Sequence, residues 1–407
     1  MLPDPYIRIA VISDLHCQKV IENSKRSRLH TELLDHPINE NPIESFKKII
    51  INKKKNVDYF FVLGDVADKG NIEGFILGVK FIKEINTLLN AEKLIFAVGN
   101  HDMHRQIAND TIQDSEYMMK RSNGFPFQFK GNDQDKIIEN EFWANKYCVI
   151  EDDKTLILVL NTSCFMGQEN SLKSIIFDEE MRESMENTML KYKPSKKLKI
   201  AICHHHPIPL SDINANYTSL DCIDRGDVLI KLLKDNNFTL LMHGHKHFPR
   251  LKYDDNFPIF CSGSFSSLEN TSAFNEDNTA HFLDVFQDGN TYKGRIETWI
   301  FNSIEGWIQS SDLKSRFPIY TGFGSRIEIS NIVENIYDNF YKKYETSDSI
   351  EKYIPIDMND ISEKVNDINF LTPLQLNQLE KELEKKNLTI SIDTKGKRKL
   401  NMNYVTD

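Results

Sequence analysis

The run Ile7-Arg8-Ile9-Ala10-Val11-Ile12 sets the pattern for the whole chain, because two potential metal ligands, Asp14 and His16, follow it directly. An apolar run of this length that is bounded by a turn predicts a β-strand. Four further runs have the same design, and they cover Asn56–Leu63, Leu94–Val98, Leu198–Cys203 and Phe238–Met242. Polar residues just past strand ends mark the edge of layered α/β folds where sites assemble, so these runs predict one shared site.

Each of the later runs also ends at a polar motif. The motifs are Gly64-Asp65-Val66-Ala67-Asp68, Gly99-Asn100-His101-Asp102, His205-His206-Pro207 and Gly244-His245-Lys246-His247. Strands that are apolar on both faces need cover on both sides. Helical spacing after Asn41-Pro42, around Phe75–Ile82 and after a cap expected at Asp224 predicts helices that supply this cover. Hairpin-like runs at Lys146–Ile150 and Thr155–Leu160 complete a prediction of two packed sheets with helices outside.

The pattern changes at about Ser325, which divides the chain into a catalytic domain, 1–324, and a mainly helical C-terminal extension, 325–407. A helical stripe begins at Ile329, and Thr372-Pro373-Leu374-Gln375 is a capping box with proline at the first helical position. The extension is interpreted as a cap packed on the main domain. An oligomerisation surface or a partner surface is the alternative.

Composition limits the classes of partner. The 407 residues are 40% hydrophobic and 27% charged, with a net charge of -10, which argues against broad electrostatic binding to nucleic acid or to an anionic membrane. A local basic groove is still compatible with this charge. The N-terminus lacks the pattern of a signal peptide, and no apolar run is long enough to span a bilayer. The six cysteines form no CxxC pair, so we expect buried thiols in a cytoplasmic protein.

The motifs offer the side chains that a pair of divalent metals needs. The candidate ligands are two aspartates, one asparagine and four histidines: Asp14, His16, Asp65, Asn100, His205, His245 and His247. A carboxylate such as that of Asp65 can bridge two ions about 3.5–4 Å apart, and a metal pair is suited to cutting phosphate esters. The glycines of the motifs allow sharp turns beside the metals.

Together, and in this order, the five motifs resemble the calcineurin-like metallophosphoesterase superfamily, over residues from about Ile7 to Ile300. The resemblance implies a four-layer α/β/β/α sandwich with two metals at the sheet edge. One metal would take Asp14, His16, Asp65 and His247, and the other Asp65, Asn100, His205 and His245. It also implies in-line attack on phosphorus by a hydroxide that bridges the metals, with His101 contacting the scissile phosphate and protonating the leaving oxygen. Manganese is the expected metal, with iron, zinc or nickel as alternatives.

One ligand assignment is ambiguous, because His204, His205 and His206 are consecutive. The superfamily's histidine usually stands two residues before a proline, which selects His205. We then expect His204 to point away from the site and His206 to be a wall residue. Asp68 and Asp102 are interpreted as residues that brace the ligands and loops rather than as ligands.

The wording of the motifs resembles the bacterial cyclic-nucleotide phosphodiesterase branch, which implies a nucleotide-like phosphodiester substrate. The protein Ser/Thr phosphatase branch usually carries an arginine and a glutamate where this chain has Lys69 and Asp102. The SbcD-type nuclease branch, acting on DNA or RNA, also uses the GNHD motif and stays open, with the extension as a nucleic-acid-binding cap. A non-catalytic, metal-bound module for a partner protein is a third hypothesis. The presence of every ligand residue of the superfamily argues against this third hypothesis.

Two long connections, Cys17–Glu40 and Met103–Asn140, leave directly from metal-site motifs and are candidate walls or lids over the site. Lys25, Arg26 and Arg28 in the first connection are candidates for recognising a substrate phosphate. A solvated loop is the alternative for them.

Overall fold

The computed structural model describes residues 2–19, 27–31, 37–103, 109–130, 135–164, 175–209, 222–268, 278–309, 320–342, 356–392 and 398–402. It divides into two compact units. One unit comprises Ile7–Leu283 and Thr298–Gln309 and holds every predicted ligand, and the other comprises Met1–Tyr6, Asp284–Glu297 and Ser310–Asp407. No helix among the described residues is long and apolar enough to cross a membrane.

The larger sheet has eight strands in the order β15-β14-β13-β1-β2-β3-β4, with β16 paired to β14. These strands are β1 (Ile7–Ile12), β2 (Tyr59–Val62), β3 (Lys93–Phe96), β4 (Phe127–Phe129), β13 (Asn278–Asp288), β14 (Thr291–Asn302), β15 (Gly306–Gln309) and β16 (Tyr320–Phe323). The strands β1, β2 and β3 run parallel to one another, so their C-terminal ends lie at one edge.

The second sheet has six strands in the order β11-β12-β10-β8-β6-β5. These strands are β5 (Tyr147–Glu151), β6 (Thr155–Leu160), β8 (Leu198–Ile202), β10 (Leu240–His243), β11 (Pro249–Asp254) and β12 (Phe257–Ser262). The predicted β5–β6 hairpin is confirmed by its antiparallel register. The strands β6, β8, β10 and β12 are parallel neighbours, which again brings their C-terminal ends to one edge.

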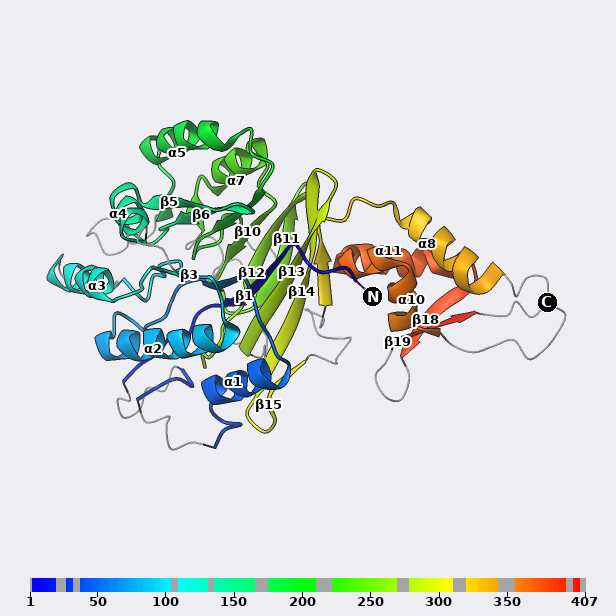
Figure 1. Ribbon diagram of the computed structural model, residues 1–407, viewed down its shortest axis with the longest axis horizontal. Helices are drawn as coiled ribbons and strands as arrows, with labels where there is room; N and C mark the ends of the chain where they lie inside the picture. The colour runs from blue at the N-terminus through cyan, green and yellow to red at the C-terminus, as the bar shows by residue number, and fades with distance from the viewer. Residues whose placement is uncertain are drawn as a thin grey trace. The chain divides into compact units, whose positions relative to one another are not determined.

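Helices cover the two sheets from outside, as Figure 1 shows: α1 (Pro42–Asn52) and α2 (Ile72–Leu89) lie on one side, and α5 (Glu179–Tyr192) and α7 (Gly226–Asp235) on the other. The predicted α/β/β/α arrangement is therefore confirmed. Two further helices are α3 (Asn109–Arg121) and α4 (Asp135–Asn145), and β7 (Ile175–Ile176) pairs with β9 (Ile223–Asp224) as a separate ribbon.

Local sequence explains where the covering helices begin. The Asn41 side chain accepts hydrogen bonds from the first backbone amides of α1, and Pro42 occupies the first helical turn. The buried face of α1 includes Ile43, Phe46 and Ile50, as the spacing predicts. The prediction of a helix cap at Asp224 is wrong, because Asp224 belongs to β9. The residue before α7 is Arg225, which has a left-handed backbone conformation and makes no capping hydrogen bond with its side chain.

The tail combines helices with a small sheet. Its elements are α8 (Ile329–Ile336), η2 (Tyr337–Tyr341), β17 (Ile356–Asp357), α10 (Met358–Lys364), η3 (Asn366–Phe370), α11 (Pro373–Glu384), β18 (Leu388–Ile392) and β19 (Arg398–Met402). The capping box at Thr372 and Gln375 is confirmed, and buried residues such as Ile332, Leu379 and Leu400 form a core. The antiparallel sheet β17-β19-β18 is absent from the sequence prediction, and the domain boundary at 324 stays a prediction.

Candidate metal centre

The parallel strands deliver the polar motifs to neighbouring sheet edges. Asp14 and Asp65 follow β1 and β2, whose register aligns Ile12 with Val62. The β3 motif begins three residues after Phe96, which pairs with Val62. In the second sheet, β8 and β10 end side by side, with Ile202 opposite Met242. The strand ends therefore bring together side chains that are distant in sequence, such as His16 and His247, which lie 231 residues apart, and this convergence is as predicted.

One group of donor atoms comprises Asp14, His16 and His247. His16 Nε2 lies 3.0 Å from His247 Nε2, which lies 3.4 Å from Asp14 Oδ1. Asp65 Oδ2 lies 3.7 Å from the same His16 nitrogen. Atoms that bind one metal through bonds of about 2.0–2.2 Å stand roughly 3–4 Å from one another. The four side chains predicted for the first metal therefore have the spacing of one ligand shell.

A second group comprises His204, His205 and His245, with one nitrogen of each within 4.8 Å of the others. Asp65 adjoins this group as well, because its Oδ2 lies 3.2 Å from His204 Nε2. Asn100 Oδ1 lies 3.2 Å from the same nitrogen. Asp65 thus stands between the two groups, which is the position that a bridging carboxylate requires.

Hydrogen bonds orient two of the imidazoles from behind. Asp68 Oδ1 lies 3.3 Å from His16 Nδ1, and a carboxylate accepts, so His16 presents the lone pair of Nε2 to the first group. Thr162 Oγ1 lies 2.9 Å from His205 Nδ1, which leaves the opposite nitrogen of His205 facing the second group. Nitrogen lone pairs and carboxylates that converge in a buried space call for cations between them, so these residues fit a divalent-metal pair.

The backbone at the site is unusual in a way that the sequence does not reveal. Five predicted ligands have a backbone φ in the left-handed region, which residues other than glycine rarely adopt. They are Asp14 at 54°, His16 at 49°, Asp65 at 53°, His245 at 75° and His247 at 60°. Such conformations cost of order 1–3 kcal/mol each and persist where function requires them. Their concentration on the predicted ligands marks the strand ends as a functional site.

Two motif glycines are needed because other chains approach them closely. A Cβ at Gly99 would lie 2.1 Å from Asp65 Oδ1 and 2.2 Å from the Asp65 nitrogen. A Cβ at Gly244 would lie 2.0 Å from Ser13 Oγ and 2.6 Å from Asp14 Oδ2. Both glycines therefore let one ligand loop pass directly over another.

A family model described as calcineurin-like phosphoesterase matches residues 7–249, which is more than half of the chain. The chain belongs to the calcineurin-like phosphoesterase family. The matched segment includes all five motifs and therefore both donor groups. No curated protein sequence matches this calcineurin-like phosphoesterase.

The solved structures that match this chain include a dimetal phosphatase from Danio rerio, at 10% identity, covering 72% of this chain and 96% of that chain with a TM-score of 0.47. A purple acid phosphatase from yellow lupin (Lupinus luteus) is 14% identical and covers 74% of this chain and 52% of its own, also with a TM-score of 0.47. A Vps29 variant from Entamoeba histolytica is 10% identical, covers 75% and 99%, and has a TM-score of 0.32.

In this calcineurin-like phosphoesterase, His101 lies at the open side of the first donor group. Its ring centroid is 4.5 Å from that of His16, and its side chain is 20% exposed, whereas that of His16 is 1% exposed. The His101 backbone amide donates to Asp65 Oδ1 at 2.7 Å, which fixes the loop against the shared carboxylate. His101 is therefore the more exposed of the two histidine rings that lie side by side at the first donor group.

Asp68 and Asp102 both form hydrogen bonds to residues of the motifs, and their role as bracing residues stays a prediction because Asp68 also forms a group of potential metal donors with His16 and His101. Asp68 Oδ1 accepts from His101 Nδ1 at 3.0 Å; burial acts to raise the pKa of Asp68, but hydrogen bonds from His101 and His16 outweigh it and hold that pKa well below its usual value. Asp102 accepts from the backbone amides of Ala67 and Gly99, each at 2.9 Å, and so ties two motif loops together. Burial, together with repulsion from Asp65, raises the pKa of Asp102 to about 7.

The structure corrects the prediction for His204. We expected this residue to point away, but its Nε2 is buried against Asp65 and Asn100. Burial by itself lowers the pKa of His204, but the Asp65 carboxylate outweighs burial and raises it to about 9. His206 is buried too, with its ring centroid 5.8 Å from that of His245, and no donor group among the described residues contains it.

Sequence reasoning also missed Thr162, which holds His205. The available signal was its position two residues beyond the end of β6, a strand that runs parallel to β8. In the first long connection, Arg28 donates to Asn278 Oδ1 at 2.9 Å and lies over the Phe301 ring, so its guanidinium is engaged within the fold. Lys25 and Arg26 lie outside the described residues.

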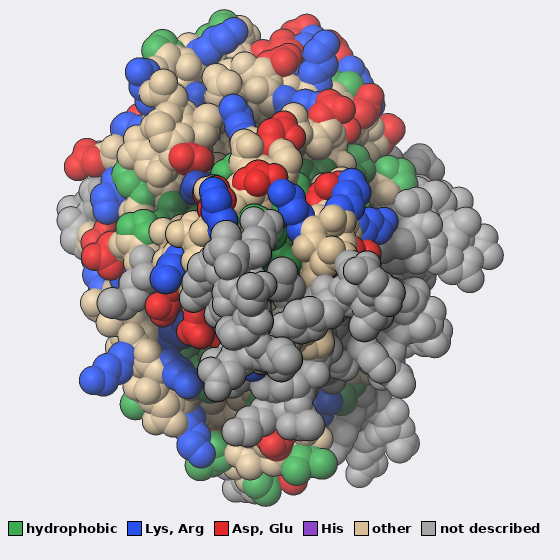
Figure 2. Space-filling view, turned by 90° about the vertical axis from the view of Figure 1, so that its right-hand side faces the viewer, with side chains coloured by type: hydrophobic (Ala, Val, Ile, Leu, Met, Phe, Trp, Pro, Cys, Tyr) green, Lys and Arg blue, Asp and Glu red, His purple; other side chains and the backbone are tan. Residues whose placement is uncertain are grey.

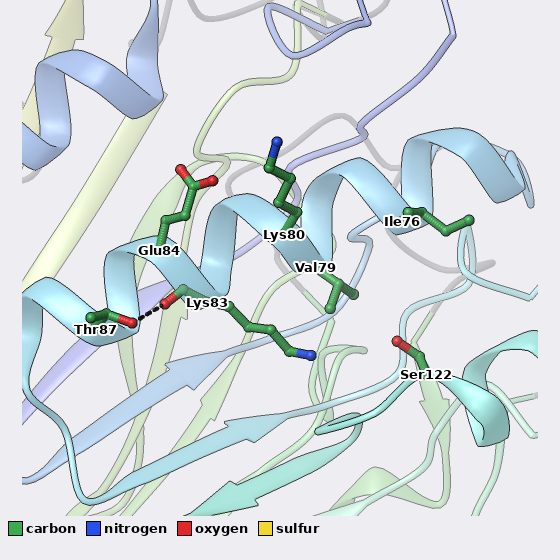
Figure 3. A pocket seen from close by; sticks show the side chains of 7 residues that line it. All are labelled: Ile76, Val79, Lys80, Lys83, Glu84, Thr87 and Ser122. Atoms are coloured by element: carbon green, nitrogen blue, oxygen red, sulfur yellow. Dashed lines mark hydrogen bonds between the residues drawn. The ribbon is translucent and has the colours of Figure 1, made fainter.

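A cavity of about 410 Å³ lies against α2, and Figure 3 shows the side chains that line it. Its lining comes from one face of α2 and from Ser122, and the residues are Ile76, Val79, Lys80, Lys83, Glu84, Thr87 and Ser122. None of these residues belongs to a motif of the metal centre. The cavity therefore supplies no part of the candidate active site.

Proposed function

We propose that this calcineurin-like phosphoesterase is a two-metal phosphodiesterase that hydrolyses a cyclic nucleotide or a similar small phosphodiester. The observation that carries the proposal is the pair of adjoining donor groups that share Asp65, with His101 beside them. When bound, the two metals supply a nucleophile at neutral pH and neutralise charge that develops on the phosphate. Manganese remains our expected metal, and a cytoplasmic location remains a prediction.

In the proposed mechanism, His101 is the general acid. A carboxylate accepts hydrogen bonds, so the contact between Asp68 Oδ1 and His101 Nδ1 places one proton on Nδ1 and orients the ring. The proton for the leaving oxygen is then carried on Nε2, at the more exposed edge of the ring. Asp68 is a positioning residue, because it acts on the reaction through His101 and His16.

The preference for a diester substrate rests on the sequences of the motifs, in which Lys69 and Asp102 stand where the protein phosphatase branch has arginine and glutamate. The nuclease alternative gains no support from the extension. Near the end of the extension the sequence has four basic residues, Lys395, Lys397, Arg398 and Lys399. Of these, Lys399 is paired with Asp357 at 3.0 Å, and Lys395 and Lys397 lie outside the described residues. On the face drawn in Figure 2, basic and acidic side chains are interspersed, as on an ordinary solvated surface.

The experiment that tests the proposal compares hydrolysis of four substrates by the manganese-loaded protein. The substrates are 3′,5′-cyclic AMP, bis(p-nitrophenyl) phosphate, p-nitrophenyl phosphate and a short DNA. We expect the two small diesters to be cleaved with the highest kcat/KM and Asp65→Asn to abolish their cleavage. Preferred cleavage of DNA would support the nuclease alternative, and the absence of any cleavage would support the non-catalytic module.

A further inference from the structure

One buried imidazole at the metal centre lies outside the predicted ligand set. The His204 side chain is 0% exposed, and its Nε2 lies 3.2 Å from Asp65 Oδ2 and 3.2 Å from Asn100 Oδ1. Both oxygens belong to predicted metal ligands. His204 therefore directs Nε2 towards two of the side chains that are predicted to hold the second metal.

The opposite side of the ring defines which nitrogen carries the proton. His204 Nδ1 lies 2.7 Å from the carbonyl oxygen of Leu63. A carbonyl oxygen only accepts hydrogen bonds, so Nδ1 is the donor, and Nε2 of the neutral ring presents a lone pair. A buried lone pair that faces two oxygens is unfavourable unless a cation lies between them. That cation is either a second ring proton or a metal.

The spacing favours the metal. Bonds of about 2.0–2.2 Å place neighbouring ligand atoms roughly 3 Å apart and opposite ones a little over 4 Å apart. The two separations of 3.2 Å fit neighbouring positions of one ligand shell, and His204, His205 and His245 each bring a nitrogen within 4.8 Å of the others. A ring proton would account for the contact with Asp65, but it leaves the convergence of three imidazoles unexplained.

We propose that His204 is a ligand of the second metal, additional to Asp65, Asn100, His205 and His245. This inference rests on the proposed function, because it requires the two-metal centre. The second metal would then have three imidazole ligands, whereas the first has two imidazoles and two carboxylates. Imidazole suits zinc, iron and nickel, and carboxylate suits manganese. The two positions therefore differ in metal preference, with zinc, iron or nickel favoured at the second.

The test is side-chain NMR of the full chain labelled with ¹⁵N-histidine and titrated with zinc, since the ¹⁵N shift separates bare, protonated and metal-bound nitrogens. The proposal predicts a metal-bound nitrogen in five histidines: His16, His204, His205, His245 and His247. Without His204 as a ligand the number is four. His204→Gln assigns the additional signal, and His206→Gln is the matched control because it removes a neighbouring buried ring.

We expect the fifth signal to vanish in His204→Gln, the affinity for the second zinc to fall about 10–100-fold, and His206→Gln to keep both the signal and the affinity. Two bound zinc ions with a His204 ring protonated at both nitrogens would overturn the inference and leave the proposed function intact. Failure of the wild-type chain to bind two ions would overturn both. The number of metal-bound signals in the wild-type chain decides the matter even where a variant does not fold.

Discussion

Gly99→Ala isolates the close approach between two ligand loops. The backbone of Gly99 lies outside the left-handed region, so alanine meets no conformational penalty there. The added Cβ would stand 2.2 Å from the Asp65 nitrogen, whereas ordinary contacts begin at 3.4 Å. Because the obstacle is backbone rather than a flexible side chain, the loops must separate by roughly 1 Å.

This separation sets the expected magnitudes. Overpacking costs about 1–3 kcal/mol of unfolding free energy, and a contact with backbone belongs at the upper end of that range. Asp65 also holds the His101 amide at 2.7 Å, so His101 moves with the displaced loop. A misplacement of about 1 Å can cost roughly 100-fold in rate, and we expect that loss in kcat/KM on bis(p-nitrophenyl) phosphate.

Urea unfolding of the metal-free protein measures the stability change, and initial rates with saturating metal measure the activity change. The matched control is Gly289→Ala, where a Cβ meets nothing within 4 Å but φ is +60°. This control should lose about 1–2 kcal/mol through its backbone conformation and keep wild-type activity. Wild-type stability and kcat/KM in Gly99→Ala would refute the close approach that the structure shows.

Three further predictions concern Asp68, Asp152 and the removal of the metals. Asp68→Asn should lower kcat about 100-fold while two metals still bind. The loss should be larger for substrates with poor leaving groups than for p-nitrophenyl esters, and equal losses would contradict His101 as the general acid. The Asp152 carboxylate accepts hydrogen bonds from Lys93 and Tyr59. Burial acts to raise the pKa of Asp152, but these two hydrogen bonds outweigh burial and lower that pKa from 3.8 to about 2. The ionised Asp152 therefore stabilises the folded state above about pH 4, and this contribution is lost as the pH falls towards 2. Urea unfolding across this range should show a shallower pH dependence in Asp152→Asn, and identical slopes would count against the pairing. Removing the metals with a chelator should lower the free energy of unfolding by about 2.7 kcal/mol for each site, if the free metal concentration was 100 times the Kd of that site. An unchanged melting temperature after chelation would argue against bound metals.

The convergence of the candidate ligands could be predicted from the sequence because parallel strands end at a shared edge. Asp14, Asp65 and Asn100 each follow a strand of the larger sheet, so strand prediction alone brings them together. The direction of His204 could not be predicted in this way. The strand β8 ends at Ile202, and beyond a strand end the alternation of side chains no longer fixes where each one points.

The C-terminal sheet was missed although its pattern was present. In β18, Leu388, Ile390 and Ile392 alternate with polar residues, which is typical of a strand with one buried face. The strong helical signal of α11 immediately before it favours the interpretation of the extension as mainly helical. The left-handed backbone of the ligands was not predictable either, because it results from packing between loops that are distant in sequence.

The central claim is that two metals, held by residues that share Asp65, perform the hydrolysis. The most direct measurement is a titration of the metal-free protein with manganese while hydrolysis of bis(p-nitrophenyl) phosphate is followed, with Asp65→Asn alongside. We expect the rate to saturate only as the second ion binds and the variant to stay inactive at every metal concentration. Saturation at one ion, hydrolysis by the metal-free protein, or full activity of Asp65→Asn would contradict it.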